Sequence, residues 1–171
     1  NSVRTGCGFD LRPDLSNVAR QEDTKCRALS DFRFAEDKAT RLLDDATRIR
    51  MRADAPFGAF LSGGLVGASV VGFMSLYKAE GLHTFSIGFD DPRFDESYFA
   101  LQAAKRFGTL HHQEVSDPNT IAHWPRFIYH CDQPHGDVSF LPTDQVSRLA
   151  AKQVKMVLTG DGGDELFAGY E

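Results

Sequence analysis

The sequence predicts an α/β fold, in which a parallel sheet carries helices on both of its faces. Two observations support this prediction. Short apolar segments of strand type alternate with helical segments of ~12 residues along the chain. Glycine-rich turns at residues 62–64 and 160–165 follow two of the apolar segments. Because strands that alternate with helices form right-handed βαβ units, we expect the strands to be parallel and ligands to bind beyond their carboxyl ends.

Length, charge and cysteine content narrow the class of protein. The chain has 171 residues, about one domain, and 19 basic against 24 acidic residues leave a net charge of −5. A protein that coats nucleic acid would carry a basic surplus, so no nucleic-acid partner is expected. No apolar run reaches the ~18 residues of a membrane span, so no membrane partner is expected. The cysteines match no metal-binding pattern, which indicates free thiols in a reducing cytosol and predicts a cytoplasmic location.

The first helical pattern begins at residue 31. Residues 1–30 mix turn residues with charges of both signs, and we expect them to form an irregular N-terminal arm. From residue 31, apolar side chains recur at helical spacing, which predicts one long amphipathic helix that ends before Pro56. We assign residues 31–171 to one domain. Because the chain stops just past a glycine-rich turn, we expect this domain to be truncated at its C-terminus.

Four strands and the helices between them are expected in the rest of this domain. The strands are apolar and bounded by turn residues, at residues 57–61, 83–89, 110–115 and 154–159. The helices are expected at residues 65–79, 96–107, 118–130 and 142–153, with a further helix after the last turn. Gly81 and Gly108 mark helix ends, and Pro142 suits the first position of a helix.

The first glycine-rich corner, Ser62-Gly63-Gly64, lies between an expected strand and an expected helix. Two glycines allow backbone amides to turn inward and form an anion-binding nest. The helix that starts at Leu65 adds unpaired amides and the positive end of its dipole, so a phosphate group fits this corner. The spacing matches neither a Walker A loop nor GxGxxG. Taken alone, a plain glycine-rich turn is an equal alternative.

The second corner has the sequence TGDGGDE at residues 159–165. A flexible backbone with clustered carboxylates suits Mg²⁺, which takes a few carboxylates, water and phosphate oxygens as ligands. A solvated acidic turn is the alternative. The magnesium-binding interpretation is favoured because both corners are expected at the same edge of the sheet.

Together, the two corners and several shorter motifs resemble the synthetase domain of asparagine synthetase and its relatives, which include the β-lactam synthetases. The motifs are RADAP (52–56), GAFLSGGL (58–65), TFSIGF (84–89), FDES (94–97), HH (111–112), DQP (132–134), LPT (141–143) and GDGGDELFAGY (160–170). The resemblance implies the PP-loop ATP pyrophosphatase fold, also described as adenine nucleotide alpha hydrolase-like. It also implies that this fold is incomplete here, because the family domain continues well beyond Tyr170.

The resemblance further implies that ATP and Mg²⁺ bind across the strand ends. The residues implied to bind ATP are Leu61, Ser62, Gly63, Gly64, Ile87, Thr159 and Gly160. Asp161 takes the acidic position associated with the adenylate intermediate, which makes it the implied catalytic residue. Asp164 takes the position of a magnesium ligand.

The implied reaction is the ATP-dependent amidation of aspartate to asparagine. The side-chain carboxylate of aspartate attacks the α-phosphorus of ATP, which gives β-aspartyl-AMP and pyrophosphate, and ammonia then displaces AMP. The partners implied are aspartate and either free ammonia or ammonia derived from glutamine by a glutaminase domain or subunit. That domain or subunit would be separate from this chain's residues, because Cys7 lies in no context that matches the terminal cysteine of glutamine-using relatives. The resemblance leaves a homodimer open.

The sequence departs from the family at two positions of the first corner. The family loop reads SGG-x-Asp-Ser, whereas Val66 and Gly67 take the last two positions here. Loss of one carboxylate and one hydroxyl is expected to cost ~10³-fold or more in rate. Three functions therefore stay open: the synthetase reaction, a catalytically impaired nucleotide-binding pseudoenzyme or fragment, and adenylation of another carboxylic acid, as in the β-lactam synthetases.

Other polar residues receive structural interpretations. We expect one of His111 and His112 to be packed and the other to be exposed, rather than a metal-binding pair. Asp95 and Glu96 are interpreted as helix caps. Asp132 and Asp137 are interpreted as turn residues, with the contact to the amino-acid substrate that the resemblance implies as the alternative.

Overall fold

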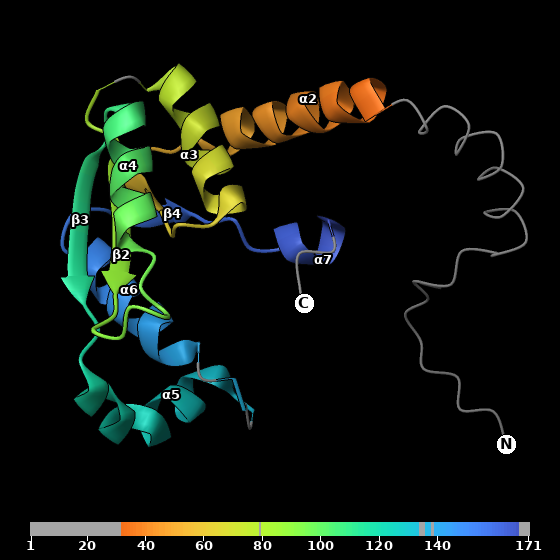
Figure 1. The fold of residues 1–171 in the computed structure, drawn as a ribbon. Coiled ribbons are helices and arrows are strands. Elements are labelled where there is room, and N and C mark those ends of the chain that lie inside the picture. The colour runs from red at the N-terminus through yellow and green to blue at the C-terminus, as the bar shows by residue number, and fades with distance from the viewer. Residues whose placement is uncertain (1–31, 79, 134–135, 138, 168–171) are drawn as a thin grey trace, which may run out of the picture. The chain divides into compact units, whose positions relative to one another are not determined.

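The computed structural model describes residues 32–78, 80–133, 136–137 and 139–167 of the chain, which Figure 1 shows as a ribbon. The expected arm, residues 1–30, lies outside the described residues. The chain divides into two compact units, residues 1–42 and 43–171. The division falls inside the first described helix, α2 (Phe32–Arg50), and the sheet and the cavities discussed below belong to the second unit. None of the described helices combines the length and apolar character needed to cross a membrane.

Four parallel strands form the sheet, as the sequence predicts. They are β1 (Phe57–Phe60), β2 (His83–Gly88), β3 (Leu110–Val115) and β4 (Met156–Leu158), in the order β3-β2-β1-β4. In the register of the sheet, Gly58 of β1 lies opposite both His83 and Val157. The two central strands, β1 and β2, therefore present their carboxyl ends side by side.

Helices cover both faces of the sheet, which confirms the predicted layering (Figure 1). On one face, α3 (Leu65–Tyr77) and α4 (Ser97–Phe107) pack on a buried cluster that includes Leu61, Met74 and Ala104. On the other face, α6 (Phe140–Ala151) packs on a cluster of Phe85, Leu149, Ala150 and Val154. Successive strand side chains point to opposite faces, so Phe60 contacts the second cluster whereas Leu61 joins the first.

The helix ends follow local chemistry. Gly108 ends α4 in the left-handed conformation, with φ of 66°, as expected for a glycine in this position. The expected helix 118–130 is instead a 3-10 helix, Pro118–His123, followed by α5 (Trp124–Cys131). Pro125 explains the break, because it has no N–H to donate within a continuous helix.

The last two helices also differ slightly from the expectation. Helix α6 begins at Phe140, two residues before the expected start at Pro142. A proline is tolerated there because the first amides of a helix have no partner within the helix. Helix α7 (Gly163–Phe167) follows the second glycine-rich corner, as predicted.

Candidate functional site

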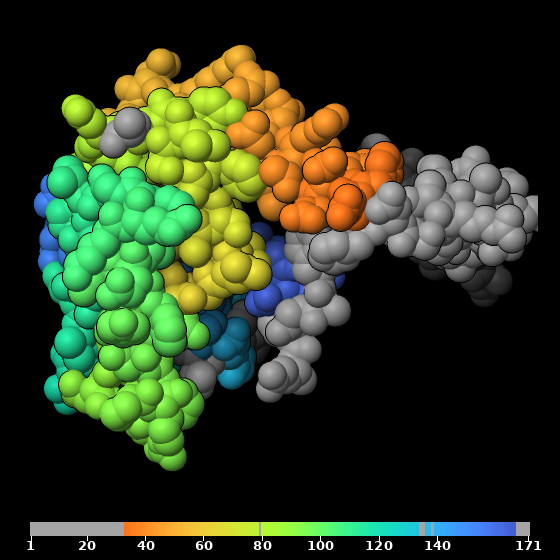
Figure 2. Space-filling view, turned by 45° about the horizontal axis from the view of Figure 1, so that its top comes forward, coloured from red at the N-terminus to blue at the C-terminus, as the bar shows by residue number. Residues whose placement is uncertain are grey.

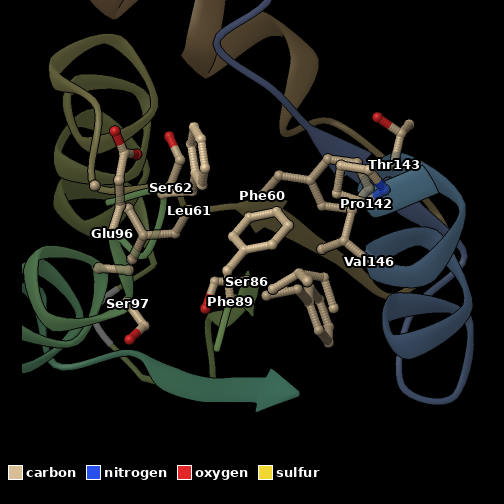
Figure 3. A pocket seen from close by; sticks show the side chains of 15 residues that line it. Phe60, Leu61, Ser62, Ser86, Phe89, Glu96, Ser97, Pro142, Thr143 and Val146 are labelled. Atoms are coloured by element: carbon tan, nitrogen blue, oxygen red, sulfur yellow. The ribbon is translucent and has the colours of Figure 1, made fainter. Parts of the chain in front are cut away.

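A cavity of about 220 Å³ lies beyond the carboxyl ends of β1 and β2. Its lining is mainly apolar and comes from residues 60–63 after β1, residues 85–89 in and after β2, the start of α4 and one side of α6. Figure 3 shows Glu96 and Ser97 on one side of this cavity and Pro142 and Val146 of α6 on the other. We call it the first cavity.

The first glycine-rich corner forms one wall of the first cavity. Leu61 is fully buried, and its N–H donates to the carbonyl of Phe85 at 2.8 Å, which joins the corner to β2. Gly64 caps α3 with an extended backbone, and its N–H donates to Ser62 Oγ at 3.3 Å. A Cβ at Gly63 would lie 2.7 Å from Cβ of Glu96, so this position accepts no side chain without movement of α4. The corner therefore presents backbone to the cavity at the start of a helix.

The second glycine-rich corner lies directly against Val66 and Gly67, which open α3 and continue the first corner. A Cβ at Gly160 would lie 2.8 Å from the backbone nitrogen of Gly67, and a Cβ at Gly163 would lie 2.5 Å from Cγ1 of Val66. In Figure 2, blue residues of the C-terminal segment are visible beside the yellow residues that begin α3. The two corners, far apart in the sequence, thus meet through close backbone approaches that glycine permits.

A second cavity of about 700 Å³ is lined by the residues of this contact and shares no lining residue with the first cavity. Its lining includes Leu43 and Thr47 of α2, Val66 and Val70 of α3, and residues 156–163 in and after β4. Thr159 Oγ1 donates to Asp161 Oδ2 at 2.8 Å, which holds the carboxylate of Asp161 against its own turn.

The structure divides the predicted site residues between these two cavities. Leu61, Ser62, Gly63 and Ile87 line the first cavity. Thr159, Gly160 and Asp161 line the second. Gly64 and Asp164 line neither, although Gly64 caps α3 and Asp164 lies in the first turn of α7.

The carboxylates of the second corner offer a limited donor set for Mg²⁺. Asp161 and Asp164 are both exposed, and within the described part of the chain no group of three or more His, Cys, Asp or Glu could hold a metal ion. Mg²⁺ is commonly held by one or two carboxylates together with phosphate oxygens and water, so these residues fit the ion when a phosphate supplies the remaining ligands. Val66 faces Gly163 with an apolar side chain where the family pattern has a carboxylate.

Several residues of the first cavity were not predicted to bind a ligand, although most of them belong to motifs that carry the family resemblance. Phe89 and Phe94 belong to the loop after β2, and Pro142, Thr143 and Val146 belong to α6. The position of the loop beyond a strand end was the available signal for the first pair. The motif LPT (141–143) was the signal for Pro142 and Thr143. Val146 reaches the cavity through tertiary packing across the sheet, for which the sequence carries no local signal.

The two adjacent histidines point to opposite faces of the sheet. His111 contacts Thr84 Oγ1 at 3.0 Å and Ser86 Oγ at 3.2 Å, whereas His112 stacks on His83 and Phe85. Burial, with a smaller contribution from His112, lowers the pKa of His111 below its ordinary value. Both side chains are half-buried, so the expectation of one packed and one exposed histidine is wrong for the exposed member.

The aspartates near α5 and α6 occupy turn positions. Asp132 ends α5 with φ of 57°, and Asp137 accepts from the N–H of Ser139 at 2.8 Å just before α6. These contacts agree with the interpretation of both residues as turn residues.

A protein-family model and several known proteins are similar to this chain in sequence. A protein-family model described as asparagine synthase matches residues 38–171. A Methanocaldococcus jannaschii protein, provisionally named glutamine-hydrolyzing asparagine synthetase 2, is 45% identical over 167 residues, which are 95% of this chain and 32% of that protein. The glutamine-hydrolyzing asparagine synthetase 1 of Bacillus subtilis is 32% identical over 98% of this chain and 27% of its own length.

Other similar proteins carry different names. The amidase chyE of Penicillium rubens is 31% identical over 95% of this chain and 25% of its own length. Among solved structures, the NH3-dependent NAD synthetase of Campylobacter jejuni has a TM-score of 0.49 and 14% identity, and covers 79% of this chain and 60% of its own. The chain spans about a quarter to a third of the length of the three curated relatives described here.

Proposed function

The chain belongs to the asparagine synthase family, and on that premise we propose that it forms the ATP-binding part of an enzyme that amidates aspartate to asparagine. The aspartate side chain would attack the α-phosphorus of ATP, so that β-aspartyl-AMP forms and pyrophosphate leaves. Ammonia, derived from glutamine by a glutaminase domain or subunit, would then displace AMP.

One observation carries this proposal: the two glycine-rich corners meet beside a cavity at the strand ends. The contacts of Gly160 and Gly163 with Gly67 and Val66 bring an anion-binding corner and an acidic corner together. If the two corners lay at distant parts of the molecule, no single nucleotide could contact both. Their proximity therefore supports a shared nucleotide site.

Each predicted residue has a role within this proposal. The first cavity would hold the adenosine part of ATP between Leu61 and Ile87, which both line it. The amides of the first corner would hold the phosphates, since they start a helix and need no charged side chain. Thr159 and Gly160, which line the second cavity, would form the far wall of the nucleotide site where the two corners meet, and Asp161 would lie beside the adenylate.

Magnesium enters the proposal through the second corner. Members of this family generally use ATP with Mg²⁺. Asp164, in the first turn of α7, would be the ligand from this chain. When bound, the ion would neutralise charge that develops on the departing pyrophosphate.

Exchange of labelled pyrophosphate into ATP tests the proposed reaction, because it needs only the adenylation step. We expect Mg²⁺-dependent exchange with aspartate, and none when aspartate is omitted. Exchange without aspartate, or with equal rates for unrelated carboxylic acids, would contradict the proposal. Asp164→Asn should lower the exchange rate. The matched change Asp144→Asn, at a half-buried aspartate of α6 that pairs with Arg148, should not.

A second candidate function is nucleotide binding without turnover. It is favoured by Val66, whose Cγ atoms occupy the contact with Gly163 where the family pattern places a carboxylate. ATP binding by calorimetry together with absent exchange would support this candidate. Exchange with a different carboxylic acid, and none with aspartate, would instead indicate that the chain adenylates that other acid. The similar protein named an amidase is a reason to include other acids in the test.

A further inference from the structure

The loop between β2 and α4 forms part of the wall of the first cavity. Phe89 at the start of this loop, and Phe94, Glu96 and Ser97 at its end, all line the cavity. Phe94 does so while 65% exposed, so packing alone does not hold it in place. Arg93 packs over the Phe94 ring at 5.5 Å within the loop, and the contacts that fix the two ends of the loop set where the loop as a whole lies.

A single carboxylate joins those two ends. Asp95 Oδ1 accepts from the N–H of Phe89 at 3.2 Å and from the N–H of Ser97 at 3.2 Å. Asp95 Oδ2 accepts from Ser97 Oγ at 2.8 Å. Hydrogen bonds to a charged acceptor are stronger than neutral ones, and these three donors keep the pKa of Asp95 below its ordinary value, with the Ser97 hydroxyl contributing most.

Gly88, at the end of β2, leaves space beside the loop for the carboxylate of Asp95. A Cβ at Gly88, the last residue of β2, would lie 3.1 Å from Asp95 Oδ1 and 3.4 Å from Cβ of Ser97. A side chain at position 88 would therefore press on Asp95 from the strand side. The same loop carries a second aspartate, Asp91, which pairs with Arg93 at its exposed tip and does not line the cavity.

From these contacts we infer that Asp95 is a positioning residue for the nucleotide cavity, which clamps Phe89 to Ser97 and so holds the loop as a wall of the site. The inference rests on the proposed function, since it takes ATP as the ligand. Asp95 itself does not line the cavity and would act through its neighbours. Its loss would act directly on the wall after β2, while the corner after β1 would keep its own hydrogen bond from Leu61 to Phe85.

The test compares Asp95→Asn with Asp91→Asn, because both variants remove one negative charge from the same loop. Loss of negative charge near an anionic ligand favours binding in both variants, so weaker binding by one of them cannot be a simple charge effect. We expect Asp95→Asn to raise the Kd for ATP about tenfold. This is the rise expected if the loop holds its wall position only about one tenth of the time in the variant. The exposed Asp91–Arg93 pair should matter little, so Asp91→Asn should stay within about twofold of the parent chain.

A second readout separates positioning from general support of the fold. Pyrophosphate alone should bind the parent chain and Asp95→Asn equally, because the corner after β1 would hold it. Equal weakening of ATP and pyrophosphate binding would overturn the assignment, as would unchanged ATP binding in Asp95→Asn. Gly88→Ala should also weaken ATP binding, because its side chain would press on Asp95. If this variant is folded and binds ATP as the parent chain does, the proposed role of Asp95 is wrong.

Failure of the proposed function would be recognised separately. If the parent chain binds no ATP, the proposed nucleotide site is wrong. Hydrogen exchange then still tests the clamp, because the amides of Phe89 and Ser97 should exchange faster in Asp95→Asn than in Asp91→Asn, and equal rates would overturn it.

Discussion

Val66 and Gly67 lie at the contact between the two corners, and their environments differ. Val66 is half-buried and faces Gly163, whereas Gly67 is buried behind Ser62. A Cβ at Gly67 would meet its nearest neighbour, Ser62 Oγ, at 3.5 Å, which is an ordinary contact distance. The corner therefore has room for a Cβ at position 67, where the family pattern places a serine.

Restoring the family pattern should increase activity. Val66→Asp with Gly67→Ser adds a carboxylate beside the second corner and a hydroxyl behind Ser62, and each restored polar contact can contribute ~10²-fold to a rate. We expect faster Mg²⁺-dependent pyrophosphate exchange in the double variant than in the parent chain. Val66→Asn with Gly67→Ser is the control, since it has similar shape but lacks the charge that attracts the metal. Equal rates in the two double variants would contradict a role for the carboxylate.

A side chain at Gly163 should destabilise the protein through Val66. Gly163→Ala places a Cβ 2.5 Å from Cγ1 of Val66, and overpacking of this kind costs about 1–3 kcal/mol in the free energy of unfolding. Val66→Ala removes both Cγ atoms and should restore most of that loss in the double variant. Gly160→Ala is the contrasting change, because its clash is with the backbone of Gly67 and no side-chain deletion relieves it. Urea unfolding of the single and double variants measures these differences.

At the scale of elements, polar side chains join β2 to β3 on the face that α4 covers. His111 bridges the hydroxyls of Thr84 and Ser86, and Thr84 also contacts Thr109 Oγ1 at 2.8 Å. Thr84 is fully buried and Ser86 is nearly so. Ser86 also lines the first cavity, so the polar network that joins β2 to β3 reaches the lining of that cavity.

The network should make stability depend on pH. The pKa of His111 is lowered in the folded chain, so the unfolded chain binds more protons below the ordinary histidine range of about 6.5. The free energy of unfolding should therefore fall as pH falls through that range, until the pH reaches the lowered pKa. The pKa of His83 is lowered as well, mainly by burial, and contributes with the same sign.

Variants of single histidines measure the contribution of each. His111→Asn should reduce the slope of the free energy of unfolding against pH between about 7.5 and about 5.5. An unaltered slope in His111→Asn would show that the pH dependence arises elsewhere.

At the scale of the whole molecule, the sheet divides the core of the second unit into two clusters. Met74 of α3 is fully buried on one face, and Leu149 of α6 is 7% exposed on the other. Because the strands between them contribute side chains to both clusters, the two faces should unfold together.

Truncation of either cluster should therefore weaken the same transition. Met74→Ala and Leu149→Ala should each lower the free energy of unfolding by about 2–4 kcal/mol. Leu76→Ala, in the same helix as Met74 but 73% exposed, should change it by less than about 0.5 kcal/mol. Thermal and urea unfolding followed by two probes should show one shared transition, and separate transitions would contradict this coupling.

Local patterns account for the parts of the molecule that the sequence predicted well. Apolar runs bounded by glycine and proline located all four strands, and Gly108 located the end of α4. The order of the strands was not predicted, because it depends on how the crossovers pack. The 3-10 helix at Pro118–His123 was missed because the interruption by Pro125 was not recognised.

The sequence drew attention to the corners of the candidate site more than to its walls, and nucleotide binding by the corner residues stays a prediction. Glycine-rich turns after strands are a local signal, and Leu61, Ser62, Gly63 and Ile87 do line one cavity. The separation of Thr159, Gly160 and Asp161 into a second cavity depends on how α2 and α3 pack beside β4, for which no short motif exists. Asp95 was interpreted as a cap, which describes its contact with Ser97 and omits its contact with Phe89.

The close approach of Gly163 to Val66 has a consequence for related sequences. The size of the side chain at position 163 limits the size of the side chain that position 66 can carry. In the same way, the side chain at position 66 limits the size of the residue at position 163. Replacements at these two positions should therefore be tolerated mainly in pairs, so an alignment of homologues should show them covarying despite their distance along the chain.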